Sequence, residues 1–270
     1  MDWQNKLNAL KQKIAEKNRL LVALSGGVDS GLLSKISTDI LGDQALCVIL
    51  DHEAFARRDL RQAMQMAESL GLNYRVTKFS MLNEPEVSKN SPQRCYFCKK
   101  VSAKVLKSIA LDETIECIAD GLNLTDFEDY RPGVKAYDEA GVWHPFVETD
   151  ISKKDIREIS KELGLYFWNK PTSSCLATRI QYDDVLSVEK LRMVENSEDF
   201  LIGLGFSEFR IRAHGKLSRI ELSHRDLASA LRHKEEICMA LKNLGFQYIT
   251  LDLEGFRSGS MNEVLWTSLP

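Results

Sequence analysis

The feature that most constrains the fold is an uninterrupted apolar run that ends at two glycines. Residues 20–24 contain only Leu, Val and Ala, and they lead directly into Ser25-Gly26-Gly27. A short apolar run that stops at glycine predicts a strand buried on both faces. Apolar residues recur at helical spacing before it, over residues 3–17, and after it, from Asp29 onward. The sequence therefore predicts a helix, a buried strand, a tight turn and a second helix.

Similar units follow along the first half of the chain. We expect strands at residues 45–50 and 73–79, a strand ending at Ala119, and a helix over residues 57–69. Strands that alternate with helices are typical of an α/β domain in which helices cover both faces of a parallel sheet. We therefore predict a doubly wound parallel sheet within residues 1–170, with ligands at the carboxyl ends of its strands.

The order of elements changes in the second half. The pattern predicts a helix, two strands, a helix and a strand, at residues 186–203, 207–213, 217–222, 225–243 and 246–253. This order favours a second, smaller α+β domain, at residues 171–270. Four glycines that follow helical periodicity predict left-handed helix ends, at Gly71, Gly164, Gly205 and Gly245.

The turn at residues 25–30 has the properties of a pyrophosphate-binding loop. Ser25-Gly26-Gly27 presents backbone N–H groups without a Cβ to block an anion, and Asp29 and Ser30 open a helix whose amino end is positive. The alternative is an ordinary strand-to-helix turn capped by Asp29 or Ser30. Neither the Gly-x-x-x-x-Gly-Lys-Ser/Thr pattern nor the Gly-x-Gly-x-x-Gly pattern occurs.

A second polar loop follows the strand that ends at Ala119. It runs Asp120-Gly121-Leu122-Asn123-Leu124-Thr125-Asp126, and Arg131-Pro132-Gly133 lies just downstream. Such a loop at a strand's carboxyl end suits a nucleotide site, although an Asx-rich turn alone would give a similar pattern. We predict that three of its residues bind the nucleotide, namely Gly121, Asn123 and Asp126.

Three of the six cysteines lie in stretches that we expect to be loops, Cys95, Cys98 and Cys175. Cys95 and Cys98 are flanked by one arginine and two lysines, which favour thiolates as ligands or nucleophiles. Three thiolates suit a 4Fe–4S cluster with one open iron better than a closed zinc site, which usually needs four ligands. The alternatives are a zinc site completed by a histidine such as His144, and a redox disulfide between Cys95 and Cys98.

Composition limits the function classes. The 36 basic and 39 acidic residues give a formal charge of -3, so no global field recruits nucleic acid or a membrane. No apolar run approaches the roughly 20 residues that span a bilayer, and the N-terminus lacks a signal-peptide pattern. We therefore expect a cytoplasmic protein without a membrane partner. The remaining cysteines lie in apolar stretches, and we assign them to the core. They are Cys47, Cys117 and Cys238.

The hexapeptide Ser-Gly-Gly-x-Asp-Ser at residues 25–30 is the signature of the PP-loop ATP pyrophosphatases. The wider set of motifs resembles the LarE family, which matures the nickel-pincer cofactor of lactate racemase. The matching stretches are Arg94-Cys95-Tyr96-Phe97-Cys98-Lys99, Asp120-Gly121-Leu122-Asn123, Arg131-Pro132-Gly133, residues 173–180, 210–212, 219–221 and 255–263. The resemblance thus covers nearly the whole chain.

This resemblance implies that ATP adenylates a carboxylate of pyridinium-3,5-biscarboxylic acid mononucleotide, and that sulfur then displaces AMP to leave a thiocarboxylate. The loop at residues 25–30 would hold the departing pyrophosphate, and Asp29 would help to hold Mg2+. The resemblance also implies sulfide or another sulfur donor as a partner, and a homo-oligomer.

Two sulfur sources are known in the family. In one branch, a cysteine at the position of Cys175 gives up its own sulfur and becomes dehydroalanine. In the other, three cysteines hold a 4Fe–4S cluster that takes up an extra sulfide and passes it on. Because Cys95, Cys98 and Cys175 are all present, the chain resembles the cluster branch, and we predict Cys175 and Asp29 as catalytic residues.

Basic residues of the second domain suggest a substrate site. Strand alternation places Arg210, Arg212 and His214 on one face. We predict that these arginines and Arg179 bind a phosphate or carboxylate of the substrate, and that Glu221 balances the pyridinium or an arginine. A solvated basic face is the alternative.

Two other functions remain open from the sequence. A PP-loop tRNA thiolase would need a nucleic-acid surface, for which the near-neutral charge balance gives little support. A non-catalytic regulator that binds ATP or metal would keep the fold without the reaction.

Overall fold

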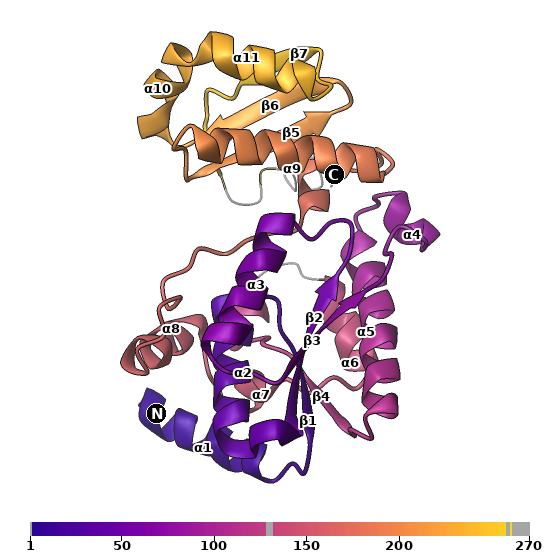
Figure 1. Ribbon diagram of the computed structural model, residues 1–270, viewed down its shortest axis with the longest axis vertical. Coiled ribbons are helices and arrows are strands. Elements are labelled where there is room, and N and C mark those ends of the chain that lie inside the picture. Colours follow the sequence, from indigo (N-terminus) through magenta and orange to yellow (C-terminus); the bar gives the residue numbers. More distant parts are fainter. Residues whose placement is uncertain (1, 128–131, 258–259, 261–270) are drawn as a thin grey trace, which may run out of the picture. The chain divides into compact units, whose positions relative to one another are not determined.

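The computed structural model describes residues 2–127, 132–257 and 260 (Figure 1). The chain divides into two compact units, each built from two segments. Unit 1 is Met1–Glu84 with Cys95–Ser173, and unit 2 is Pro85–Arg94 with Ser174–Pro270. The predicted domain boundary after residue 170 stays a prediction. The sequence did not indicate that Pro85–Arg94, just ahead of Cys95, belongs to unit 2.

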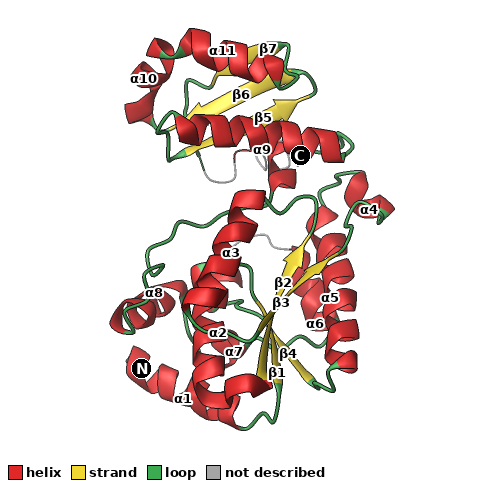
Figure 2. Cartoon of the chain, viewed as in Figure 1, coloured by secondary structure: helices red, strands yellow, loops and turns green. Residues whose placement is uncertain are grey.

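Unit 1 alternates helices and strands as predicted (Figure 2). Its α-helices are α1 (Trp3–Ala15), α2 (Val28–Leu41), α3 (Arg57–Ser69), α5 (Arg94–Asp112), α6 (Pro132–Glu139), α7 (Pro145–Glu148) and α8 (Lys153–Glu162). Its strands are β1 (Leu20–Ala23), β2 (Ala45–Asp51), β3 (Tyr74–Lys78) and β4 (Cys117–Ala119). Two short 3-10 segments are η1 (Gly42–Gln44) and η2 (Leu124–Phe127).

Among the described residues, the larger sheet has the strand order β3-β2-β1-β4, and all neighbouring strands are parallel. Leu21 of β1 pairs with Leu46 of β2 on one side and with Ile118 of β4 on the other. The chain therefore winds outward from β1 in both directions. The predicted doubly wound sheet is confirmed, and its switch point lies between β1 and β4, where such sheets bind ligands.

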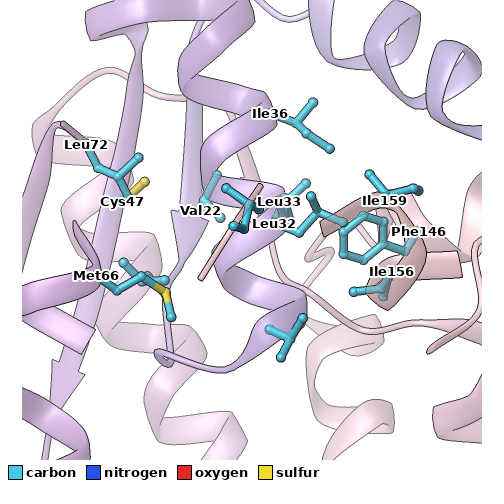
Figure 3. Packing of buried hydrophobic residues seen from close by; sticks show 14 of the residues in the cluster. Val22, Leu32, Leu33, Ile36, Cys47, Met66, Leu72, Phe146, Ile156 and Ile159 are labelled. Carbon is cyan, nitrogen blue, oxygen red and sulfur yellow. The ribbon is translucent and has the colours of Figure 1, made fainter. Parts of the chain in front are cut away.

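Both faces of this sheet are covered by helices. Leu20 and Val22 of β1 point into a core that α1, α2, α3 and α8 complete. Leu21 points to the opposite face, into a core with α5 and α6. Figure 3 shows the first core, in which Phe146 and Ile156 pack toward α2. Burial on both faces explains why β1 is apolar at every position.

Unit 2 is the smaller α+β body that the sequence predicts. Its strands are β5 (Phe209–His214), β6 (Leu217–Leu222) and β7 (Tyr248–Leu251). Its helical segments are α4 (Pro85–Ser88), η3 (Leu176–Arg179), α9 (Val188–Gly203), η4 (His224–Asp226), α10 (Leu227–Arg232) and α11 (Lys234–Asn243). Strand β6 pairs antiparallel with β5 and parallel with β7.

One predicted element of unit 2 is wrong in detail. The expected continuous helix over residues 225–243 is interrupted at His233, whose backbone angles of φ -93° and ψ 12° lie outside the helical region. Its ring packs edge-on against Phe206, with the ring centroids 6.5 Å apart. By contrast, Gly205 and Gly245 have φ angles of 90° and 117°, as expected for glycine after a helix. In the described part of the chain, no helix combines the length and apolar character needed to cross a bilayer.

Candidate active site

The loop between β1 and α2 depends on glycine. Gly26 has a φ of 75°, and a Cβ there would lie 2.8 Å from Cβ of Ala63 in α3. Both the backbone conformation and the space therefore exclude a side chain. Helix α2 begins at Val28 with Gly27 in the capping position, so neither Asp29 nor Ser30 occupies the cap that the alternative interpretation assigned to them.

Two serines fix the shape of this loop. The Ser25 N–H donates to Ser30 Oγ at 3.1 Å, and the Ser30 hydroxyl donates to the Gly27 carbonyl at 3.3 Å. The two hydroxyl oxygens lie 3.0 Å apart. Ser25 is exposed while Ser30 is buried. The side chains of the loop therefore fix its conformation at the amino end of α2, where an anion is favoured.

The second predicted loop lies directly against the first. A Cβ at Gly121 would lie 2.7 Å from the Ser30 nitrogen and 2.9 Å from the Asp29 carbonyl carbon. Only glycine permits this approach of two backbones. The structure thus brings together the two loops that the sequence predicts to bind one nucleotide, at the carboxyl ends of β1 and β4.

Asn123 and Asp126 close the second loop on itself. The backbone N–H and the Nδ2 of Asn123 donate to Asp126 Oδ2 at 3.1 and 2.8 Å, and the Thr125 N–H donates to Asn123 Oδ1 at 3.1 Å. These bonds form the Asx-type turn that was the alternative interpretation. A nucleotide-binding role of both residues stays a prediction. Arg131, named with this loop, lies outside the described residues.

A histidine bridges two carboxylates beside this loop. His144 Nδ1 lies 2.6 Å from Asp120 Oδ1, and His144 Nε2 lies 3.1 Å from Asp138 Oδ1. Burial alone would lower the pKa of His144, but the two carboxylates outweigh burial and hold its pKa above the usual value. The sequence offered His144 only as a zinc ligand, and its contact with Asp120 was not foreseen.

Two lysines that sequence reasoning missed contact the PP-loop region. Lys153 Nζ lies 2.5 and 2.7 Å from the two carboxylate oxygens of Asp29. Lys170 Nζ donates to the Gly26 carbonyl at 2.9 Å, and burial lowers the pKa of this lysine. Both lysines are more than a hundred residues from the loop in sequence, so no local sequence pattern predicts that they contact it.

His52 follows β2 at the same edge of the sheet. Its ring packs edge-on against Phe79, and burial lowers its pKa to about 4, so the imidazole is neutral at pH 7. Its Nδ1 is buried and meets no hydrogen-bond partner among the residues the structure describes. A neutral imidazole can donate a hydrogen bond to a ligand or accept one from it.

The first cysteine pair lies on a helix. The expectation that Cys95 and Cys98 occupy a loop is wrong, because both lie in the first five residues of α5, which begins at Arg94. Their spacing of three residues places both side chains on the same face of that helix. Cys175 lies in unit 2, immediately before η3. In the described ranges, no three or more His, Cys, Asp or Glu side chains are grouped to hold a metal ion.

The remaining cysteines are not equally buried. Cys47 is fully buried in the core beside β1, as predicted, and burial raises the pKa of its thiol to about 11. Cys117 and Cys238 are only partly buried. Burial also raises the pKa of Cys117.

Arg179 organises the loop that carries Cys175. Its Nη1 donates to the carbonyl of Ser174 at 2.7 Å, to the carbonyl of Cys175 at 3.1 Å and to Thr178 Oγ1 at 2.9 Å. On its other side, Nε donates to Glu198 Oε1 at 2.9 Å. Both charged side chains of this pair are only 1% exposed. Arg179 is thus buried in an ion pair, and its predicted contact with substrate stays a prediction.

Arg212 and Glu221 form a second buried network in unit 2. Arg212 Nε donates to Glu221 Oε2 at 3.0 Å, and Arg212 Nη1 donates to the Thr178 carbonyl at 3.0 Å. Arg219 and Ser260 donate to Glu221 Oε1 at 2.9 and 2.7 Å. Glu221 therefore balances arginines, one of the two roles that the sequence suggested.

Arg210 differs from its neighbour on the same strand face. It is half-buried, and its guanidinium lies 5.0 Å from the ring centroid of Phe256. The predicted strand alternation is confirmed, since Phe209, Ile211 and Ala213 are buried on the opposite face.

The segment ahead of Cys95 is fastened to the segment after Cys175 within unit 2. Arg94 is buried and donates to the Ala177 carbonyl at 3.1 Å, and it also contacts Asn90. Asn90 Nδ2 donates to the Gln181 carbonyl at 2.8 Å. Arg94, next to Cys95, and Ala177, two residues after Cys175, are therefore hydrogen-bonded inside one unit.

Comparisons with known proteins extend over both units. A family model described as NAD synthase matches residues 2–103. An uncharacterised protein of Synechocystis is 37% identical over 264 residues, which cover 97% of this chain and 98% of that protein. The pyridinium-3,5-bisthiocarboxylic acid mononucleotide synthase of Lactiplantibacillus plantarum is 37% identical over 253 residues, covering 93% of this chain and 92% of that protein. An uncharacterised protein of Methanocaldococcus jannaschii is 34% identical over 251 residues, which cover 93% of this chain and 95% of that protein.

Proposed function

The chain belongs to the LarE family of PP-loop ATP pyrophosphatases, and we propose that it is an ATP-dependent sulfur transferase acting on pyridinium-3,5-biscarboxylic acid mononucleotide. In this proposal it converts a carboxylate of that mononucleotide to a thiocarboxylate, a step in making the nickel-pincer cofactor. The observation that carries the proposal is the contact of Gly121 with Ser30 and Asp29, which joins two predicted nucleotide loops at the switch point of the sheet.

The first half of the reaction is adenylation at this edge of the sheet. A carboxylate oxygen of the substrate attacks the α-phosphorus of ATP, and the bond to the β-phosphate oxygen breaks to release pyrophosphate. In this proposal the backbone donors of Gly26 and Gly27 would meet the leaving anion as it gains charge, in a loop whose shape Ser25 and Ser30 hold. Asp29 is the carboxylate that would hold Mg2+, which neutralises the phosphates.

The second half is sulfur delivery. Cys95, Cys98 and Cys175 would hold a 4Fe–4S cluster, which supplies a replaceable sulfide at its open iron. Support comes from the shared helix face of Cys95 and Cys98, and from the Arg94 contact with Ala177. Sulfur supplied in this way would bond to the acyl carbon in place of the AMP oxygen, so that AMP would leave with that oxygen.

Unit 2 provides the proposed substrate contacts. Arg210, partly buried beside an aromatic ring, is the arginine best placed to meet a phosphate or carboxylate. Arg179, Arg212 and Glu221 hold the surrounding loops through buried ion pairs, and their direct contacts with substrate belong to the same proposal. We also propose a small-molecule sulfur donor and a homo-oligomeric assembly.

The experiment that tests this function is ATP–pyrophosphate exchange with the anaerobically prepared protein. We expect exchange that depends on the pyridinium dicarboxylate mononucleotide, and a product heavier by the replacement of oxygen with sulfur. Exchange without the mononucleotide, or stimulated by tRNA instead, would point to a different acceptor.

Iron content separates the two sulfur sources. We expect about four irons in the wild-type protein, and loss of iron in both Cys95→Ala and Cys98→Ala. The matched control is Cys238→Ala, since Cys238 lies in α11 of unit 2 and has no assigned role. If the protein instead loses the mass of one sulfur at Cys175 during turnover, the sacrificial-cysteine branch applies.

A further inference from the structure

Lys153 makes a contact that the proposed chemistry has not yet used. Its Nζ spans both carboxylate oxygens of Asp29, at 2.5 and 2.7 Å. Asp29 is the acidic residue of the PP-loop and the proposed Mg2+ ligand. A cation therefore lies at the point where the phosphates and their metal ion are expected to bind.

The backbone of Lys153 is held firmly. Ser152 caps α8 in a capping box with Asp155, and Asp155 is fastened to Lys6 of α1 at 2.7 Å. The Lys153 N–H donates to Thr125 Oγ1 in the second nucleotide loop at 3.2 Å. The start of α8 is thus anchored to α1 and to η2, while the flexible four-carbon side chain of Lys153 carries the charge to the loop.

The contact with Asp29 is open to exchange. The two side chains are 26% and 24% exposed, so water and dissolved ions reach the pair. Mg2+ binding at Asp29 would compete with the lysine for the same two oxygens. The ammonium group would then lie next to phosphate oxygens, which it can bind as a compact point charge.

We propose that Lys153 rests on Asp29 in the nucleotide-free protein and moves to the β- and γ-phosphates when Mg2+ and ATP bind, where it stabilises the departing pyrophosphate. This inference rests on the proposed function, because it requires ATP at the PP-loop. It adds a substrate-binding cation from outside the PP-loop sequence and assigns the Lys153–Asp29 pair a role before nucleotide binds.

The test compares two ligands, each of which corresponds to a different part of ATP. Magnesium pyrophosphate contains the phosphates that Lys153 would contact, whereas AMP lacks both of them. Calorimetry would measure the Kd of each ligand for wild-type protein and for Lys153→Met, which keeps the side-chain length without the charge. The matched control is Lys154→Met, because Lys154 is the next residue of α8 and its side chain is 84% exposed.

We expect Lys153→Met to weaken pyrophosphate binding by about 10–100-fold, the usual loss for one hydrogen bond to a charged group. AMP binding should change by less than about twofold, since no Lys153 contact with AMP is proposed, and Lys154→Met should bind both ligands like the wild type. Lys153→Arg, which keeps the charge, should recover part of the pyrophosphate affinity.

Unchanged pyrophosphate affinity in Lys153→Met would overturn the inference while leaving the proposed function intact. An equal loss of pyrophosphate and AMP affinity, or a loss that Lys153→Arg does not recover, would also overturn it, because either result means that Lys153 only supports the fold of the site. If wild-type protein bound neither ligand, the proposed function itself would fail, and the inference with it.

Discussion

Glu198→Ala tests how the Cys175 loop is held. In the wild type, Glu198 accepts from Arg179 inside unit 2, and Arg179 donates to four oxygens of residues 174–178. Both charged side chains are 1% exposed, so the variant leaves a guanidinium buried without its carboxylate. Breaking a buried ion pair in this way costs about 3–5 kcal/mol. For a unit of roughly a hundred residues, that loss corresponds to a melting temperature lower by about 10 °C or more.

The assay combines thermal unfolding with amide hydrogen exchange. Exchange read by mass spectrometry assigns any loss to a segment, which matters because two units need not unfold together. We expect faster exchange in α9, in β5 and at residues 174–179, with α2 and β1 unchanged. Glu198→Gln, which keeps the shape without the charge, should fall between the wild type and Glu198→Ala.

A matched control removes an ion pair at the surface. Glu158 and Lys154 lie 4.0 Å apart on α8, with side chains 45% and 84% exposed. Glu158→Ala should therefore cost less than about 1 kcal/mol. If Glu198→Ala melted within about 2 °C of the wild type and exchanged no faster at residues 174–179, the buried pair would not hold the loop, and the reasoning would be refuted.

Two further predictions concern unit 1. In Gly121→Ala, the new Cβ would meet the Ser30 nitrogen at 2.7 Å, so the PP-loop must shift, and we expect ATP turnover to fall by about 100-fold, as for a misplacement of about 1 Å. Gly203→Ala, where the space is open, is the control and should match wild-type turnover. His144 has a raised pKa because the Asp120 and Asp138 carboxylates outweigh burial, so its stabilisation is complete below the unfolded pKa of about 6.5 and is lost as pH rises through the folded pKa. The difference in unfolding free energy between the wild type and His144→Gln should thus be larger at pH 5.5 than at pH 8.5, and a difference that grows with pH would contradict the assignment.

The sequence predicts the sheet and the loops well because their signals are local. The apolar run at residues 20–24 indicates a strand, and the glycines that directly follow it permit a tight turn, so both are evident from neighbouring residues. Contacts between distant residues have no such signal. Lys153 contacts Asp29 although 124 residues separate them in the sequence, and only the folded chain shows that α8 begins beside the PP-loop.

Charged residues show the same limit. Strand alternation correctly places Arg210 and Arg212 on one face, but it does not show that Arg212 is buried against Glu221 or that Arg179 meets Glu198. Burial and pairing depend on how α9 packs on β5, which the alternation pattern does not contain.

The sequence contains a signal for the helix that carries Cys95 and Cys98 in place of the expected loop. A Ser-Pro pair at residues 91–92 is a recognised start signal for a helix, and α5 begins two residues later. The stretch around Cys95 and Cys98 was expected to be a loop, whereas helix α5 places both thiols on one face.

The central claim is that the substrate carboxylate is adenylated and that sulfur then displaces AMP. Labelling the carboxylates of the pyridinium mononucleotide with oxygen-18 tests this directly, because the oxygen that attacks the α-phosphorus leaves with AMP. The account predicts AMP that carries one oxygen-18 atom for each thiocarboxylate formed. Unlabelled AMP, or ADP in place of AMP and pyrophosphate, would contradict it.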